Sequence, residues 1–272
     1  MFSVLMSVYK NDNPIFFKRA LESIYENKNL KPSEIVVVKD GPVSIELEMV
    51  LAQWESKNSS SVNIKIIGLK ENVGLGEALR IGLTHCSHKL VARMDADDIS
   101  MPDRFELQYQ FLLLNPKVSL VGGSIEEFVH EGNKPLCKRV PPRNADIMKY
   151  AKFRNPVNHV TVMFRKEDIV SVGSYMTMHG FEDYFLWVRL LKNGYSIANI
   201  FNVLVRVRLG ENFNARRSGF LYIKREVKFL FQIYKIGFLT KFNLFKMLST
   251  RMPLRILPPF ALSAVYRLAR KR

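Results

Sequence analysis

Four short apolar runs alternate with amphipathic segments in the N-terminal part of the chain, and this alternation restricts the fold more than any other feature. The runs are Phe2–Val8, Glu34–Val38, Val62–Leu69 and Lys89–Met94. Runs of this length that are rich in β-branched residues are typical of strands covered on both faces. The sequence therefore predicts an α/β fold in which helices flank a parallel, doubly wound sheet with right-handed crossovers.

Local signals mark the helices between these strands. Asn13 followed by Pro14 is typical of an N-cap and a first helical position, which predicts a helix to about Glu26. The other predicted helices run from about Ser44 to Lys57, from Asn72–Gly76 through Leu83, and over Arg104–Leu114, Lys166–Val172 and Phe185–Leu191. Two further strands are predicted at Val118–Phe128 and His159–Phe164, on either side of a loop-rich stretch at 130–158.

The fourth apolar run ends in three carboxylates within four residues: Asp95, Asp97 and Asp98. Like charges at the end of a buried strand repel one another and must be paired or solvated. On an extended segment Asp95 and Asp97 leave on the same side, which suits an oxygen-liganded Mg²⁺ or Mn²⁺ ion. The alternative is a helix N-terminus with Asp98 or Ser100 as its cap, and for Asp98 this cap is the favoured interpretation.

Other polar residues also follow the predicted strands. In doubly wound sheets, ligands bind at the carboxyl ends of the strands, where Tyr9, Asp40, Asn72 and the Asp95/Asp97 pair stand in this sequence. The Gly74/Gly76 turn lacks G-x-x-x-x-G-K-[ST], and no G-x-G-x-x-G follows the first strand. These absences argue against a P-loop and against a Rossmann dinucleotide site.

Positive charge is concentrated at the C-terminal end. Residues 200–272 hold 16 of the 41 Lys and Arg residues and two of the 25 acids, a net charge of +14 out of +16. Such a local basic field favours a polyanionic surface, either phospholipid or nucleic acid. Aromatic residues stand among these basic ones, and no apolar run is long enough to predict a transmembrane span. The segment is predicted to form amphipathic helices on an anionic membrane, with ordinary packing helices as the alternative.

Cysteine usage and the N-terminus indicate the compartment. The two cysteines, Cys86 and Cys137, predict no disulfide framework and favour a reducing compartment. The first residues lack the features of a signal peptide and are read as a strand.

Six segments resemble the family 2 glycosyltransferases that have a GT-A fold. In chain order they are SVLMSVYKND, EIVVVKDG, ENVGLGEALRIGL, ARMDADD, NPVNHVTVMFRK and GFEDYFLWVRL. The resemblance covers about residues 1–210 and is strongest to bacterial enzymes that assemble O-antigen or exopolysaccharide repeat units. It implies a GT-A domain at 1–210, followed by a basic helical tail at 211–272.

The resemblance also implies roles for individual residues. Asp183 would be the catalytic base, and the aromatic residues around it would form a floor for a sugar ring. Asp95 and Asp97 would hold Mn²⁺ or Mg²⁺. Donor contacts would come from Tyr9, Asp40, Asn72 and Asp95, and acceptor contacts from Glu182, His159, Trp187, Arg216 and Arg217.

Two positions depart from the family pattern. Lys39 stands where many relatives have the first of two acids, and Leu79-Arg80 stands where many have Arg-Asn. Both departures concern residues that would contact the donor. The resemblance therefore indicates the type of reaction better than the identity of the donor.

The implied activity is inverting transfer of a hexose, glucose or galactose, from a UDP-sugar. The acceptor would be a sugar on undecaprenyl diphosphate, at the cytoplasmic face of the bacterial inner membrane, and the product a β-linkage. The chemistry requires a divalent metal to offset leaving-group charge and one carboxylate to take the hydroxyl proton. A sugar-phosphate nucleotidyltransferase and a basic nucleic-acid-binding protein are the alternatives. The nearly neutral main body argues against the latter, so no nucleic-acid partner is expected.

Overall fold

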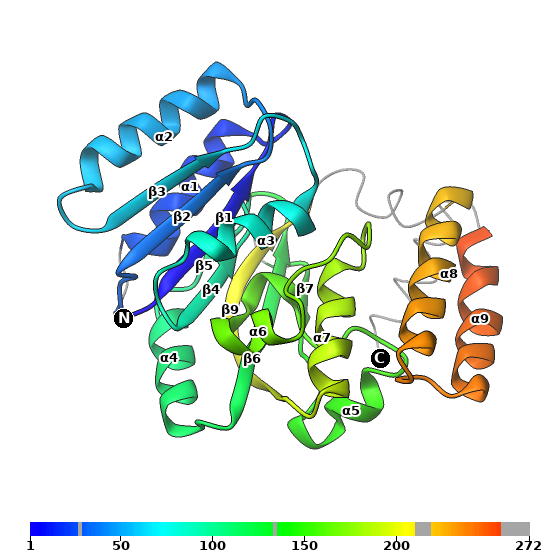
Figure 1. The fold of residues 1–272 in the computed structure, drawn as a ribbon. Helices are drawn as coiled ribbons and strands as arrows, with labels where there is room; N and C mark the ends of the chain where they lie inside the picture. The colour runs from blue at the N-terminus through cyan, green and yellow to red at the C-terminus, as the bar shows by residue number, and fades with distance from the viewer. Residues whose placement is uncertain (27–28, 133–134, 210–218, 257–272) are drawn as a thin grey trace.

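The computed structural model describes residues 1–26, 29–132, 135–209 and 219–256, and these form a helix-flanked sheet (Figure 1). Within them the sheet has nine strands in the order β3-β2-β1-β4-β8-β6-β9-β5, with β7 paired to β6. The strands are β1 (Ser3–Val8), β2 (Glu34–Lys39), β3 (Asn63–Gly68), β4 (Leu90–Met94), β5 (Ile99–Ser100), β6 (Val118–Phe128), β7 (Cys137–Arg139), β8 (Met163–Arg165) and β9 (Ser196–Arg208).

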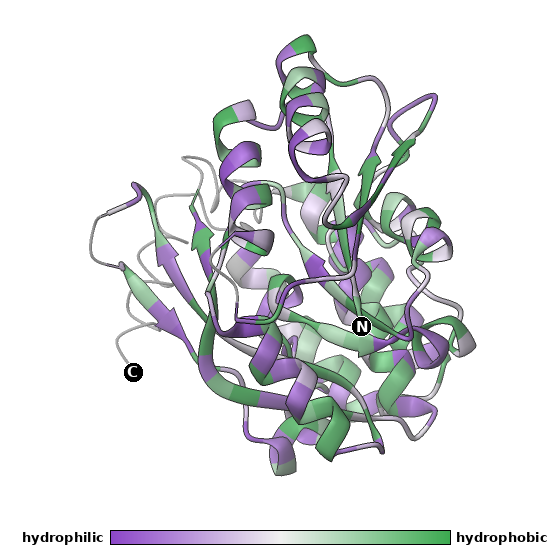
Figure 2. Cartoon of the chain, turned by 90° about the vertical axis from the view of Figure 1, so that its left-hand side faces the viewer, coloured by the Kyte–Doolittle hydropathy of each residue, from purple (hydrophilic) through white to green (hydrophobic). Residues whose placement is uncertain are grey.

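The helices cover both faces of this sheet. They are α1 (Pro14–Tyr25), α2 (Ile45–Asn58), α3 (Leu75–His85), α4 (Arg104–Leu114), α5 (Ile147–Tyr150), α6 (Lys166–Ser171), α7 (Glu182–Lys192), α8 (Phe220–Lys235) and α9 (Lys241–Ile256). In Figure 2 they carry hydrophobic and hydrophilic residues along their length, as expected for helices with one buried side.

The N-terminal half of the sheet agrees with the prediction. β1 pairs in parallel with both β2 and β4, and β2 pairs in parallel with β3. Alternate residues of these strands enter two cores: Leu5 and Val36 pack toward α3 and α7, whereas Val4 and Ile35 pack toward α1 and α2. Parallel pairing places the carboxyl ends of β1 to β4 at one edge of the sheet.

The C-terminal half of the sheet mixes directions. β8 is antiparallel to β4 and β6, and β9 is parallel to β6. The predicted strand at His159–Phe164 is wrong at its start, because residues 159–161 form a 3₁₀ turn and the strand begins at Met163. β9 was not predicted.

The α8–α9 hairpin packs on the rest of the molecule. Phe229 of α8 is fully buried and stacks on Phe181 at a centroid distance of 4.7 Å, beside the start of α7. The buried Glu226 of α8 pairs with Arg251 and Arg255 of α9. One side of each helix thus packs against the protein, as expected for the ordinary packing helices that were the alternative to membrane-bound ones. The domain boundary near residue 210 stays a prediction. Among the described helices, none is both long and apolar enough to cross a membrane.

Candidate active site

Asp95 stands directly after β4 and is oriented by a buried arginine. Arg93, only 2% exposed, contacts both oxygens of Asp95, with 2.6 Å between Nη1 and Oδ2. The two residues alternate along an extended segment, so their side chains leave on the same side. The carboxylate of Asp95 is partly exposed and held in one position.

Asp97 and Asp98 have different environments. Asp98 is buried and accepts a hydrogen bond from the backbone N–H of Arg208 at 2.9 Å. The predicted cap role of Asp98 is therefore wrong, and α4 begins only after Asp103. Asp97 is exposed to solvent. Partial burial of its carboxyl group, together with the neighbouring charge of Asp95, raises the pKa of Asp97 to about 6. Asp97 is thus the accessible member of the group.

The sequence analysis missed Asp12, in the loop after β1. Its Oδ2 accepts a hydrogen bond from the backbone N–H of Tyr9 at 2.9 Å, which closes the turn that follows the strand. Burial, and then the charges of Asp97 and Asp95, raise the pKa of Asp12 to about 7. The turn could be read from the sequence, but the proximity to the Asp95/Asp97 loop depends on the pairing of β1 with β4.

These carboxylates fit a divalent cation that a substrate helps to bind. Among the described residues, no group of three or more His, Cys, Asp or Glu side chains is placed to hold a metal ion by itself. Mg²⁺ is ordinarily held by one or two carboxylates together with substrate phosphates, so a complete cage is not required. Burial is the main cause of the raised pKa values of Asp97 and Asp12, and the neighbouring carboxylate charges, which a cation would offset, raise them further.

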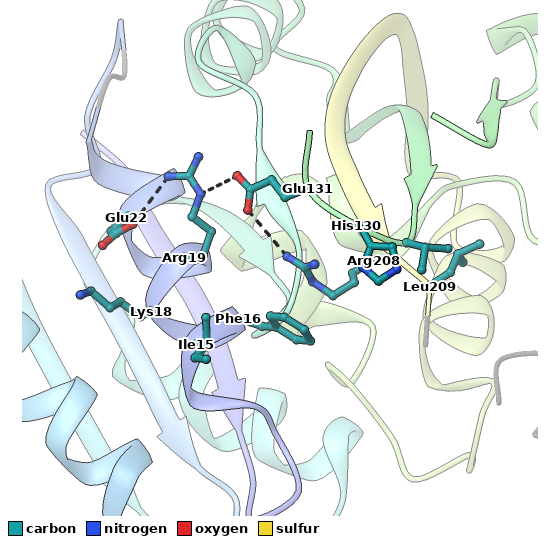
Figure 3. Close-up of a pocket in the computed structure, with 10 residues that line it drawn as sticks. Ile15, Phe16, Lys18, Arg19, Glu22, His130, Glu131, Arg208 and Leu209 are labelled. Atoms are coloured by element: carbon teal, nitrogen blue, oxygen red, sulfur yellow. Dashed lines mark hydrogen bonds and ion pairs between the residues drawn. The ribbon is translucent and has the colours of Figure 1, made fainter. Parts of the chain in front are cut away.

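Arg208, at the end of β9, lies near Phe16 and Glu131 (Figure 3). Its Nε donates to the carbonyl oxygen of Asp97 at 3.2 Å, and its guanidinium lies 3.8 Å from the ring centroid of Phe16. Glu131 lies between two arginines, 2.8 Å from Arg19 and 3.9 Å from Arg208. These residues line a hollow of about 670 Å³. Arg208 had been given no site role and was counted only among the basic residues of 200–272.

The loops after β2 and β3 are joined through Asp40. Its Oδ1 accepts from the Val73 N–H at 2.7 Å, and its Oδ2 accepts from the Gly74 N–H at 3.0 Å and from Asn72 Nδ2 at 3.1 Å. Gly41 has φ +83°, and a Cβ there would lie 2.7 Å from the Asn72 nitrogen. EIVVVKDG and ENVGLGEALRIGL, two of the segments that resemble the family, thus form one structural unit.

The residues that depart from the family pattern form other contacts in the structure. Lys39 binds Glu48 of α2 at 2.7 Å, which directs its charge to that helix. Leu79 is fully buried, and Arg80 pairs with Glu77 within α3. Tyr9 is half-buried in the loop after β1.

A cleft of about 920 Å³ brings Asp95 together with Glu182, Asp183 and His159. Asp183 lies in the first turn of α7, and its Oδ2 accepts a hydrogen bond from Asn155 Nδ2 at 2.6 Å. Asn155 was part of the family resemblance but had been given no role. The arrangement presents an oriented carboxylate to the cleft, where it can take a proton from a bound hydroxyl.

Glu182 lies beside Asp183 in the same cleft. Its Oε2 accepts from the Gly180 N–H at 2.9 Å, and burial, followed by the charge of Asp183, raises its pKa. Gly76 at the start of α3 leaves room for this side chain, because a Cβ there would lie 2.7 Å from Glu182 Cγ.

His159 forms a polar contact at the base of the cleft. Its Nε2 lies 3.0 Å from the hydroxyl of the buried Tyr175, and burial, with the nearby charge of Arg93, holds its pKa well below the ordinary value. A neutral imidazole can exchange hydrogen bonds with a sugar hydroxyl but adds no charge to the cleft.

The predicted aromatic floor beside Asp183 is wrong. Trp187 is fully buried and packs against the His159 ring at 5.8 Å, so it offers no surface to an acceptor. Phe181 and Tyr184 are also buried, against α8. The predicted acceptor residues Arg216 and Arg217 lie outside the described residues.

Comparisons with known proteins show the family of the chain. The family model "Glycosyl transferase family 2" matches residues 3–174. The amylovoran biosynthesis glycosyltransferase AmsE of Erwinia amylovora is 40% identical over 266 residues, covering 94% of this chain and 96% of that protein. A UDP-Gal:alpha-D-GlcNAc-diphosphoundecaprenol beta-1,3-galactosyltransferase of Escherichia coli is 39% identical over 267 residues, covering 98% and 95%.

Solved structures of low identity share the fold. S. aureus TarS 1-349 in complex with UDP-GlcNAc has a TM-score of 0.64 at 16% identity, covering 92% of this chain and 70% of that one. The mannosyltransferase PcManGT from Pyrobaculum calidifontis, in complex with GDP-Man and Mn²⁺, has a TM-score of 0.61 at 16% identity, covering 98% and 79%. The predicted GT-A architecture is confirmed.

Proposed function

The chain belongs to glycosyl transferase family 2, and we propose that it transfers galactose from UDP-galactose to N-acetylglucosamine on a polyprenyl diphosphate. That it is a glycosyltransferase follows from the family and from its relatives. The choice of galactose and of this acceptor rests on one observation, the 39% identity over 95% of the galactosyltransferase from Escherichia coli. The product would serve the assembly of an O-antigen or exopolysaccharide.

In the proposed mechanism, Asp183 is the general base. An acceptor hydroxyl attacks the anomeric carbon of the donor sugar, the bond from that carbon to the diphosphate oxygen breaks, and UDP leaves with the bonding electrons. Asp183 takes the hydroxyl proton, while Asn155 holds the other end of its carboxylate. One base without an enzymic nucleophile inverts the anomeric centre, so an α-linked donor gives a β-linked product.

The donor side would lie at the carboxyl ends of β1 to β4. Tyr9, Asp95 and the loop that joins Asp40 to Asn72 would receive the nucleotide. Asp97, with Asp95 and Asp12 beside it, would hold Mn²⁺ or Mg²⁺. When bound, such an ion offsets the negative charge of the diphosphate leaving group.

A galactosyl-transfer assay tests this proposal. UDP-galactose and UDP-glucose are each offered with GlcNAc-diphosphate-lipid and Mn²⁺, and the product is treated with a linkage-specific β-galactosidase. We expect transfer from UDP-galactose, cleavage by the β-galactosidase, and loss of transfer in EDTA or on Asp97→Ala. Transfer from UDP-glucose alone would overturn the choice of sugar, and full activity in EDTA would overturn the metal.

We further propose peripheral attachment to an anionic membrane through the outward sides of α8 and α9. Phe242 and Phe245 are each 71% exposed, with Lys241 and Lys246 beside them. Exposed aromatic residues among lysines suit the interface of an anionic bilayer, where each cation contributes roughly 1 kcal/mol. The acceptor lipid would then be reached at the cytoplasmic face.

Vesicle flotation tests the membrane proposal. We expect Phe242→Ser with Phe245→Ser to reduce binding to vesicles that contain anionic phospholipid, whereas Phe201→Ser, at a residue 50% exposed on β9, should leave it unchanged. Equal binding by all proteins would refute the proposal. Point variants are preferable to truncation before Arg251, because truncation would leave the buried Glu226 without its partners.

A further inference from the structure

Two cations at the cleft with Asp183 have no acidic partner. Lys138 of β7 and Arg154, which follows α5, are both exposed, and neither forms an ion pair with any other residue that the structure describes. The other two cations in the cleft are matched, Arg93 by Asp95 and Arg139 by Glu127. The cleft therefore offers two positive charges to an incoming anion.

Exposed apolar side chains stand on the same segments of the chain as these cations. On β7 the residues alternate, so that Arg139 turns to Glu127 while Leu136, Lys138 and Val140 are exposed. Leu136 and Val140 are 65% and 56% exposed, and Met148 of α5 is 44% exposed. A surface that combines cations with exposed apolar groups suits an anionic headgroup joined to a hydrocarbon chain.

The same part of the molecule adjoins α9. Arg251 donates to the carbonyl oxygen of Phe153, and the Lys246 ammonium lies 5.0 Å from the centroid of the Phe153 ring. Arg154 is the next residue in the chain. Arg154 is thus placed between the proposed base, which Asn155 contacts, and the hairpin proposed to face the lipid, and Lys138 lines the same cleft.

We propose that Lys138 and Arg154 bind the diphosphate of the lipid-linked acceptor, and that Val140 and Met148 contact the first part of its lipid. This inference rests on the proposed function. The acceptor sugar must reach Asp183 in the cleft, and its diphosphate must leave toward the membrane. Arginine binds phosphate oxygens through two parallel N–H groups, and lysine adds a point charge. The donor diphosphate is assigned to the other side, near Asp97.

Kinetics with paired acceptors test the assignment. One acceptor is GlcNAc-diphosphate-alkyl, and the other joins GlcNAc to the same alkyl chain through a neutral linker. For Lys138→Ala with Arg154→Ala, we expect KM for the diphosphate acceptor to rise at least about tenfold. KM for the neutral acceptor and for UDP-galactose should not change. Lys138→Arg with Arg154→Lys should restore most of the affinity, and Lys117→Ala is the control at an exposed lysine outside the cleft.

Binding of an alkyl diphosphate without sugar separates this proposal from the proposed function. We expect the wild-type protein to bind it and the double alanine variant to lose most of that binding, with an unchanged circular dichroism spectrum. Wild-type binding without galactose transfer would refute the choice of substrates but not the diphosphate site. Equal affinity in both proteins, or a rise in KM for UDP-galactose alone, would overturn the site.

Discussion

The proposed donor side and the proposed acceptor side of the site are built in different ways. On the proposed donor side, the polar groups follow neighbouring parallel strands, and backbone amides of the adjacent loop fix them, as Val73 and Gly74 fix Asp40. On the acceptor side, contacts join segments that are separate in the fold, as Asn155 joins Asp183. The topology of the sheet alone places the first group, whereas the second depends on how the loops between β6 and β8 pack against α7.

Removal of the proposed base on the acceptor side is expected to have the largest effect on activity. Asp183→Asn keeps the shape of the side chain and removes its basicity. We expect kcat to fall by about 10²–10⁴-fold, the range for loss of a positioned general base. The affinity for UDP-galactose, measured by calorimetry, should remain near that of the wild-type protein because the proposed donor contacts lie elsewhere.

Asp168→Asn is the matched control for that variant. Asp168 is also an acid in the first turn of a helix, α6, but it does not line the cleft. Its replacement should leave kcat unchanged. If both variants behave alike, Asp183 contributes only to a helix terminus. If Glu182→Gln has the large effect instead, the base is the neighbouring residue.

Asn155→Ala should give the next largest effect. Without the 2.6 Å hydrogen bond, the Asp183 carboxylate is free to rotate away from the acceptor hydroxyl. We expect kcat to fall by about tenfold to a hundredfold, as for a small misplacement of a catalytic group. Asn158→Ala, at another cleft asparagine that instead donates to the Gly123 carbonyl, is the comparison variant. Equal losses in both variants would indicate a general effect of loop packing.

The same division explains what the sequence could predict. The strands β1 to β4 and the positions of Asp40, Asn72 and Asp95 followed from alternation and from the rule that parallel strands end together. Asp12 and Arg208 were missed because their roles depend on strand pairing between distant segments. Trp187 was misjudged because its apolar ring suits a buried helix face as well as a sugar floor, and only packing decides between them.

A smaller effect is expected on the donor side from Arg208→Gln. The variant loses the stacking on Phe16 and the charge near Asp97, so the Asp97 loop is held less firmly. We expect the Mn²⁺ concentration for half-maximal activity to rise by about tenfold, the usual lower range for a residue that supports a metal ligand. Activity at saturating Mn²⁺ should be nearly restored. A loss of kcat that added metal does not restore would contradict a role through the metal.

Glu34→Gln is expected to have the smallest effect on activity, because this residue lies at the start of β2, at the opposite end of the strand from Asp40. Burial alone would raise the pKa of Glu34, but hydrogen bonds from Lys65, Ser3 and Ser87 together lower it from 4.5 to about 2. The unfolded chain therefore binds this proton at a higher pH than the folded protein does. The bonds contribute on the order of 2–3 kcal/mol to the free energy of unfolding above pH about 4.5, and this contribution is lost as the pH falls toward 2.

Urea unfolding at several pH values measures this contribution. At neutral pH, Glu34→Gln should lower the free energy of unfolding by about 2 kcal/mol, and the difference from wild type should shrink between pH 4.5 and 2. Glu55→Gln, at an exposed position of α2, should change it little. If kcat is unchanged, the loops of the proposed donor side tolerate a loss of stability at the start of β2. The strand register would then still bring the carboxyl ends of the strands together. A large loss of kcat would instead show that the start of β2 and the donor loops act as one unit.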